Sequence, residues 1–165
     1  MLREANRTAV ELSRDLDETV GVAVWGNFGP TIVHWAPRGD PFTDNSRAGL
    51  VVPLLSSASG LAFAAWLPPE LTAPYIEREL APGQGIGDVQ ERLQVIKSAG
   101  VSRVVSVLHE GDRTAVSAIS APMFDPSGDM VIAPTVAGPA DQLDVHEGSR
   151  VAARLREAAR ALQGK

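Results

Sequence analysis

A four-residue turn in the second half of the chain is the feature that most restricts its fold. Asp125-Pro-Ser-Gly128 has Asp at the first turn position, Pro at the second and Gly at the fourth, the residue pattern of a type I turn. Apolar, strand-like segments flank this turn at residues 115–124 and 130–136. Strands joined by so tight a turn must run antiparallel, so the pattern predicts a hairpin within an antiparallel sheet.

Helical segments are expected at both ends of the chain and in its middle. Residues 2–16 carry apolar side chains at three- and four-residue intervals, and residues 151–162 repeat that spacing. Between them, strand-like segments at 19–25 and 31–35 precede three helical pieces, the third of which we expect Asp88 to cap. The order of helix, strands, helices, strands and helix predicts an α+β fold, with helices packed against the sheet and a small molecule held between them.

Length and composition indicate one domain and exclude several functions. The 165 residues suffice for a single core, and the formal net charge of −5 gives no basic patch for nucleic acid. Cysteine is absent, which excludes disulfides and Cys-based zinc sites. The N-terminus has no signal-peptide core and no apolar run could cross a membrane, so we expect a cytoplasmic protein with no membrane partner.

The segment most informative about function runs from Gly49 to Ala65. An apolar strand passes through Pro53 into the small-residue loop Ser56-Ser-Ala-Ser-Gly60, which an apolar helix follows. Small side chains let a ligand approach the backbone, and the free N–H groups of a helix start attract carboxylate or phosphate. Ser57 or Ser59 is the expected N-cap. Taken alone, the segment fits an ordinary capped helix better than an anion site, and the rest of the chain shifts that balance.

Three sequence blocks resemble the effector-binding domain of IclR-type transcriptional regulators, over nearly the full length. Residues 18–24, Glu-Thr-Val-Gly-Val-Ala-Val, are similar to the family's first strand. Residues 53–65 are similar to its loop and helix LP-x-x-A-T/S-A-x-G-K-A-x-L-A. Residues 118–128 with Val136-Ala-Gly-Pro139 are similar to its hairpin A-A-P-V-F-D-x-x-G…S-V-S-G-P.

The resemblance implies a GAF- or profilin-like sensor domain without enzymatic activity, cofactor or bound metal. Residues 1–16 would form a linker helix, 17–145 the sensor core and 146–165 the C-terminal helix. The implied partners are a small organic acid, aliphatic or aromatic, and further copies of the chain in a homodimer or homotetramer. DNA would be bound only through a winged-helix domain absent from this sequence, which is expected to be a portion separated from a longer regulator rather than a natural domain without its DNA reader. Position by position, the implied effector-binding residues are Val52, Ser57, Ala58, Ser59, Gly60, Val116, Ala118, Thr135 and Ala137.

The chain departs from the family pattern at several of these positions. Leu61 replaces the common lysine after the loop glycine, and Ala137 replaces a hydroxyl-bearing residue. The segment 101–114 is longer than usual, which leaves the family's acidic pocket residue unplaced. Pro134 lies in the return strand, where a missing N–H suggests an edge or a bulge. We therefore expect a larger or more hydrophobic effector than a two- or three-carbon keto acid.

Other functions fit the sequence less well than a ligand sensor. The loop lacks the first glycine of a G-x-S-x-G elbow, so a serine hydrolase is disfavoured, and His34, His109 and His146 have no metal-ligand spacing. The stronger alternative is a structural module for oligomerisation or protein binding with a vestigial pocket, which the lost lysine and hydroxyl slightly favour.

Overall fold

The computed structural model describes residues 1–39, 49–109 and 112–163, of which residues 106–109 and 112–114 are described by their backbone alone. Within these residues one antiparallel sheet has the strand order β3-β2-β1-β7-β5-β4, and β6 pairs with β7 beside this path. The strands are β1 (Thr19–Gly26), β2 (Gly29–Ala36), β3 (Leu50–Val51), β4 (Ser102–His109), β5 (Asp112–Ser120), β6 (Met123–Phe124) and β7 (Met130–Pro139). The predicted α+β class with an antiparallel sheet is confirmed.

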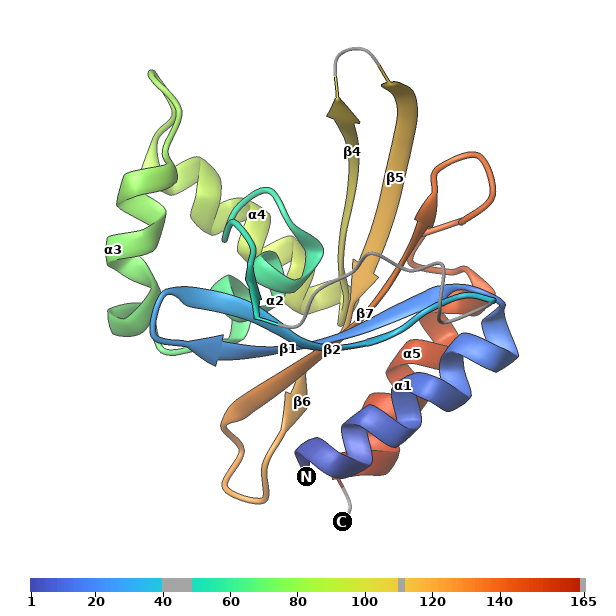
Figure 1. Cartoon of the computed structure of the whole chain (residues 1–165). Coiled ribbons are helices and arrows are strands. Elements are labelled where there is room, and N and C mark those ends of the chain that lie inside the picture. Colours follow the sequence, from blue (N-terminus) through green and yellow to red (C-terminus); the bar gives the residue numbers. More distant parts are fainter. Residues whose placement is uncertain (40–48, 110–111, 164–165) are drawn as a thin grey trace.

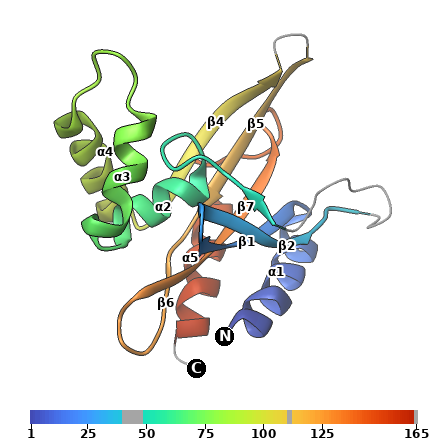
Figure 2. The same ribbon diagram turned by 60° about the vertical axis from the view of Figure 1, so that its left-hand side comes forward.

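Helices cover both faces of the sheet (Figure 1, Figure 2). Two long helices, α1 (Leu2–Leu16) and α5 (Arg150–Gln163), pack together on one face. Three helices, α2 (Ala58–Trp66), α3 (Pro69–Glu79) and α4 (Ile86–Ala99), stand on the other face. None of these described helices has the length and apolar character needed to span a membrane.

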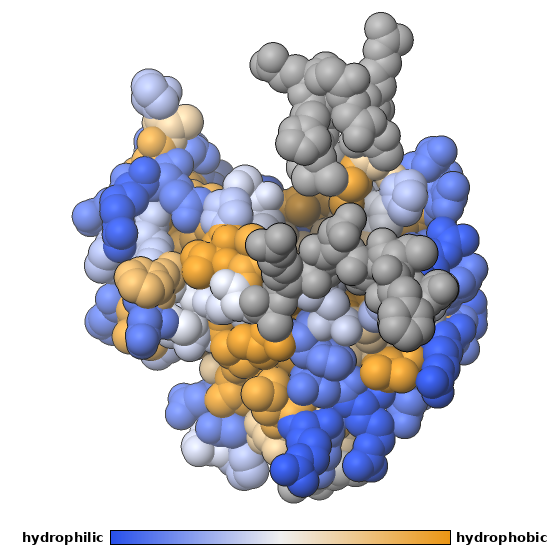
Figure 3. Space-filling model, viewed as in Figure 1, coloured by the Kyte–Doolittle hydropathy of each residue, from blue (hydrophilic) through white to orange (hydrophobic). Residues whose placement is uncertain are grey.

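Each face of the sheet has its own hydrophobic core. Val20, Val22 and Val136 turn toward α1 and α5, whereas Ala23 and Ala133 turn toward α2. This alternation is the two-residue period of a strand, and it means that the sheet is covered on both sides. Viewed as in Figure 3, hydrophilic side chains dominate over α1, and apolar side chains gather centrally, between α3 and the strands.

The predicted turn at residues 125–128 is present, but the strand before it is divided. Gly128 N–H donates to the carbonyl of Asp125 at 3.0 Å, and the Asp125 carboxylate accepts from the N–H of Ser127. The predicted strand 115–124 is two strands, β5 and β6, separated at Ala121 and Pro122. Both pair with the continuous β7.

Of the two positions that the sequence suggests for Pro134, an edge or a bulge, the edge is wrong. Pro134 lies in β7, between β1 on one side and β5 and β6 on the other. Its carbonyl accepts from Ala121 N–H at 3.2 Å, so its missing N–H also faces the break between β5 and β6. A central strand tolerates this proline because the neighbouring ladder is interrupted opposite it.

The two predicted helix caps have different outcomes. Ser57 is the N-cap of α2, and its hydroxyl accepts from Gly60 N–H at 2.9 Å, as expected for a capping serine. The cap of α4 is Gly85, not Asp88, which lies inside the first turn of the helix. In the first turn the carboxylate still lies near the positive end of the helix dipole. An aspartate is therefore favourable both at the N-cap, where it was expected, and in the first turn, where it lies.

Glu18, between α1 and β1, is a buried carboxylate with one orphaned oxygen. Its side chain lies over Gly138, only 7% of the residue is exposed, and Oε2 has no hydrogen-bond partner among the described residues. Burial raises the pKa of Glu18; the Arg38 guanidinium opposes the shift and the Asp17 carboxylate adds to it. The ionised form therefore costs folding free energy.

We expect Glu18→Gln to stabilise the domain by about 1 kcal/mol near pH 7, because a neutral amide replaces a poorly solvated charge. A raised folded-state pKa means that the native protein binds the proton more tightly, so the wild-type penalty develops as pH rises above the ordinary value of 4.5. The gain should thus vanish in acid. Urea unfolding at several pH values measures it, with exposed Glu11→Gln as control; a gain independent of pH would contradict this account.

Candidate functional site

A chain of buried hydroxyls joins α2 to the middle of the sheet. Ser59 Oγ lies 2.7 Å from Thr135 Oγ1, which donates to Ser120 Oγ at 2.9 Å. Ser120 in turn donates to the carbonyl of Pro134 at 3.1 Å. Each hydroxyl supplies one proton in the same direction, so all three are satisfied and fix the start of α2 over β7 and β5.

The same sheet face continues beyond α2 as a partly buried apolar surface. Thr135 pairs with Ser120, and the next pairs outward on this face are Ala137 with Ala118 and Pro139 with Val116. The last four side chains are partly buried, whereas Thr135 and Ser120 are buried. These four partly buried side chains form a small, apolar floor on the sheet face beside the start of α2.

The first turn of α2 is closely tied to the chain before it. Ser57 Oγ donates to the Pro53 carbonyl at 2.6 Å, and Leu61 N–H donates to the Ser57 carbonyl at 2.9 Å. With Gly60 N–H on the Ser57 hydroxyl, the described hydrogen bonds leave the N–H groups of Ala58 and Ser59 as the remaining donors of this turn. Two adjacent backbone donors suit a carboxylate.

A clamp on the loop before α2 was not predicted from the sequence. The Glu79 carboxylate, at the end of α3, accepts from Leu54 N–H at 2.8 Å and from Leu55 N–H at 3.0 Å. Arg92 of α4 donates to the Leu55 carbonyl at 3.2 Å. The Glu79 carboxylate therefore already binds two backbone N–H groups of this loop. No local sequence pattern distinguishes Glu79 from the other glutamates of α3.

The structure brings most, but not all, of the predicted site residues together. Ser57, Ala58, Ser59 and Gly60 form the start of α2, Thr135 bonds to Ser59, and Val116, Ala118 and Ala137 extend the same face. Val52 lies apart from this group: it follows β3, the strand furthest from β5 in the sheet order, and its N–H donates to the Pro30 carbonyl. Leu61, in place of lysine, is fully buried, so an ammonium at this position would lack solvent.

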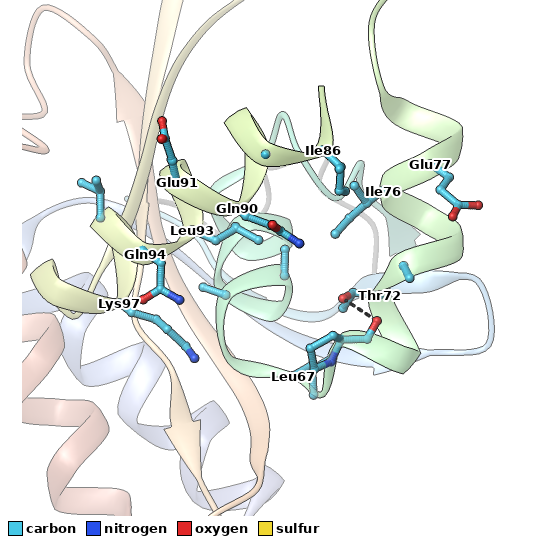
Figure 4. A pocket seen from close by; sticks show the side chains of 16 residues that line it. Leu67, Thr72, Ile76, Glu77, Ile86, Gln90, Glu91, Leu93, Gln94 and Lys97 are labelled. Carbon is cyan, nitrogen blue, oxygen red and sulfur yellow. Dashed lines mark hydrogen bonds between the residues drawn. The ribbon is translucent and has the colours of Figure 1, made fainter. Parts of the chain in front are cut away.

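A separate cavity lies on the outer side of α2. It has a volume of about 900 Å³. Residues of α2, α3 and α4 line it, together with Leu67 just after α2 (Figure 4). None of the predicted effector-binding residues lines this cavity. No group of three or more His, Asp or Glu residues within the described part of the chain could hold a metal ion.

Comparison with known proteins identifies the family to which this chain belongs. The family model described as bacterial transcriptional regulator IclR C-terminal matches residues 1–163. The crystal structure of HmgR from Pseudomonas aeruginosa has a TM-score of 0.87 and 36% identity, and covers 99% of this chain and 65% of that chain. No match was found among curated proteins.

Two further solved structures show the same fold at lower identity. IclR from Thermotoga maritima gives a TM-score of 0.78 at 20% identity, over 98% of this chain and 66% of that chain. A double mutant of the PobR inducer-binding domain from Acinetobacter, in complex with 3-hydroxybenzoic acid, gives 0.74 at 19% identity, over 96% and 95%. The chain therefore spans about two thirds of the length of HmgR and of the Thermotoga protein.

Proposed function

Because the chain belongs to the family of bacterial transcriptional regulator IclR C-terminal domains, we propose that it senses a small organic carboxylate, with an aromatic acid as the preferred class. Members of this family are transcriptional regulators, and the chain is an effector-binding domain rather than an enzyme. Bound effector would control DNA binding by an attached winged-helix domain, within a cytoplasmic homodimer or homotetramer.

The observation that carries the proposal is the apolar sheet face next to two adjacent backbone donors. Ala58 and Ser59 N–H would hold the carboxylate, while Val116, Ala118 and Ala137 would contact the apolar part of the ligand. The hydroxyl chain through Thr135 has no proton to spare, so it would position α2 and accept a hydrogen bond at most. The complex of the PobR inducer-binding domain with 3-hydroxybenzoic acid supports an aromatic acid.

The domain organisation proposed for this chain follows from the same assignment. Residues 1–16 would connect to the winged-helix domain, residues 17–145 would form the sensor core, and residues 146–165 would close it. A structural module with a vestigial pocket is the weaker proposal, because the family consists of effector-binding regulators.

A thermal-shift panel of aliphatic and aromatic carboxylates tests the proposed function. A ligand present at about 100 times its Kd should stabilise the domain by roughly 2.7 kcal/mol. Ala118→Trp should abolish the shift, because the indole would fill the proposed floor without touching the bond between Ser59 and Thr135. Ser59 itself is 3% exposed, so Ser59→Trp would disturb folding as well as binding.

Ala153→Trp, at an exposed position on α5, is the matched control and should keep the full shift. A carboxylate that stabilises wild type and Ala118→Trp equally would show that the proposed floor is wrong. A panel without any shift would leave the structural module as the better proposal.

A further inference from the structure

The cavity on the outer side of α2 combines an apolar interior with neutral polar groups. Figure 4 shows Ile76 of α3 and Ile86, Gln90 and Leu93 of α4 pointing into the space between the two helices. Ala64 and Ala65 of α2 close its base, and both are 6% exposed. At about 900 Å³ the cavity is of the size that holds small molecules in proteins.

The polar groups of this cavity favour a neutral ligand. Gln90 is exposed and points into the cavity, so its neutral amide can bond to a hydroxyl or carbonyl group of a ligand (Figure 4). Thr72 is 1% exposed, and its hydroxyl donates a long bond of 3.4 Å to the Pro69 carbonyl. The charged lining residues Glu77, Glu91 and Lys97 are exposed, and Figure 4 shows the carboxylates of Glu77 and Glu91 pointing away from the space between the helices. An anion would lose hydration against the apolar walls with no buried cation among these lining residues to compensate, which favours a neutral ligand, in contrast to the proposed carboxylate site on the sheet.

The cavity walls also hold the clamp on the loop before α2. Glu79 lies one turn beyond Ile76 on α3, and Arg92 adjoins Leu93 on α4. The Glu79 carboxylate accepts from the N–H groups of Leu54 and Leu55, and Arg92 donates to the Leu55 carbonyl. A ligand that shifts α3 relative to α4 would therefore change the hydrogen bonding of the loop that leads into the start of α2.

We propose that this cavity is a second binding site, for a neutral, largely apolar aromatic molecule with one hydroxyl or carbonyl group. Its occupation is transmitted through Glu79 and Arg92 to residues 54–55. The site rests on the cavity, and only its regulatory meaning rests on the proposed function. A neutral molecule and an acid would then be sensed by one domain at two places.

Calorimetric titration with 1-naphthol tests the site, and 1-naphthoate is a probe of matched shape that carries a negative charge. We expect 1-naphthol to bind the wild-type chain. In Ala118→Trp, where the indole fills the proposed carboxylate site, 1-naphthoate should bind at least about tenfold more weakly than 1-naphthol. Ala73→Trp should weaken 1-naphthol at least about tenfold, because Ala73 lines the cavity and its exposed position accepts an indole without strain in the core. Ala118→Trp, on the sheet face, should leave 1-naphthol affinity unchanged.

Hydrogen exchange provides a readout of transmission. In the wild-type chain, 1-naphthol should change the exchange rates of the Leu54 and Leu55 amides, and in Ala73→Trp it should not. Equal affinity for wild type and Ala73→Trp, no binding to wild type, or unchanged exchange on binding would each overturn the proposal. If the wild-type chain does not bind 1-naphthol and Ala73→Trp loses self-association, the cavity is instead part of a protein interface. Failure of the carboxylate panel alone would leave this site intact.

Discussion

Gly60→Ala is expected to lower the free energy of unfolding by about 3–4 kcal/mol. A Cβ atom at Gly60 would lie 2.5 Å from the Leu54 carbonyl oxygen and 2.7 Å from Leu54 Cα, and closer still to the Pro53 carbonyl oxygen. These are backbone atoms of a loop whose amides Glu79 holds, so neither partner can yield cheaply. Urea unfolding followed by tryptophan fluorescence measures the loss.

Gly87→Ala is the matched control for this prediction. Gly87 lies in the first turn of α4, and a Cβ atom there would meet nothing within 4 Å. Alanine should stabilise the domain by about 0.5–1 kcal/mol, because it restricts the unfolded chain without a clash. Similar destabilisation by both substitutions would show that the approach of α2 to residues 53–54 is not what requires glycine.

Phe63→Ala is expected to cost about 3–5 kcal/mol of unfolding free energy. The Phe63 side chain is fully buried between α2 and the sheet, and its ring centroid lies 5.8 Å from that of Trp25. Removing the ring forfeits its transfer from water and leaves a hole beneath α2. Chemical denaturation measures the cost.

Phe28→Ala removes the same side chain from the turn between β1 and β2, where Phe28 is 78% exposed. Its effect should stay within about 0.5 kcal/mol. A loss at Phe63 no larger than that at Phe28 would contradict the assignment of Phe63 to the core of the α2 side.

Features set by local spacing were predictable from the sequence. The terminal helices follow from apolar residues three and four positions apart, and the turn at 125–128 follows from its Asp, Pro and Gly. The proximity of Ser59 to Thr135 came from family resemblance, since 76 residues separate them and neither pattern refers to the other. The structure shows that the two hydroxyls share a hydrogen bond, and effector binding by either residue stays a prediction.

Features set by tertiary contacts were missed. The break between β5 and β6 depends on the partner strand β7, and the central place of Pro134 depends on that break. Glu79 binds Leu54 and Leu55 across 25 and 24 residues, a pairing that requires α3 to be folded back over the loop. The cavity beside α3 is likewise a property of three packed helices, which no single segment encodes.

The pairing of the first helix with the last limits the order in which this domain can assemble. Arg154 of α5 and Asp15 of α1 are 139 residues apart in the chain, yet their side chains lie 2.8 Å apart. Closing so long a loop is entropically costly and therefore late, whereas the β1–β2 hairpin and the β6–β7 hairpin close locally. Until residues 150–163 dock, the apolar stripe of α1, with Ala5, Ala9 and Leu12, has only part of its cover. The partly folded state most prone to aggregation should accordingly be one in which the sheet has formed but α5 has not yet packed against α1.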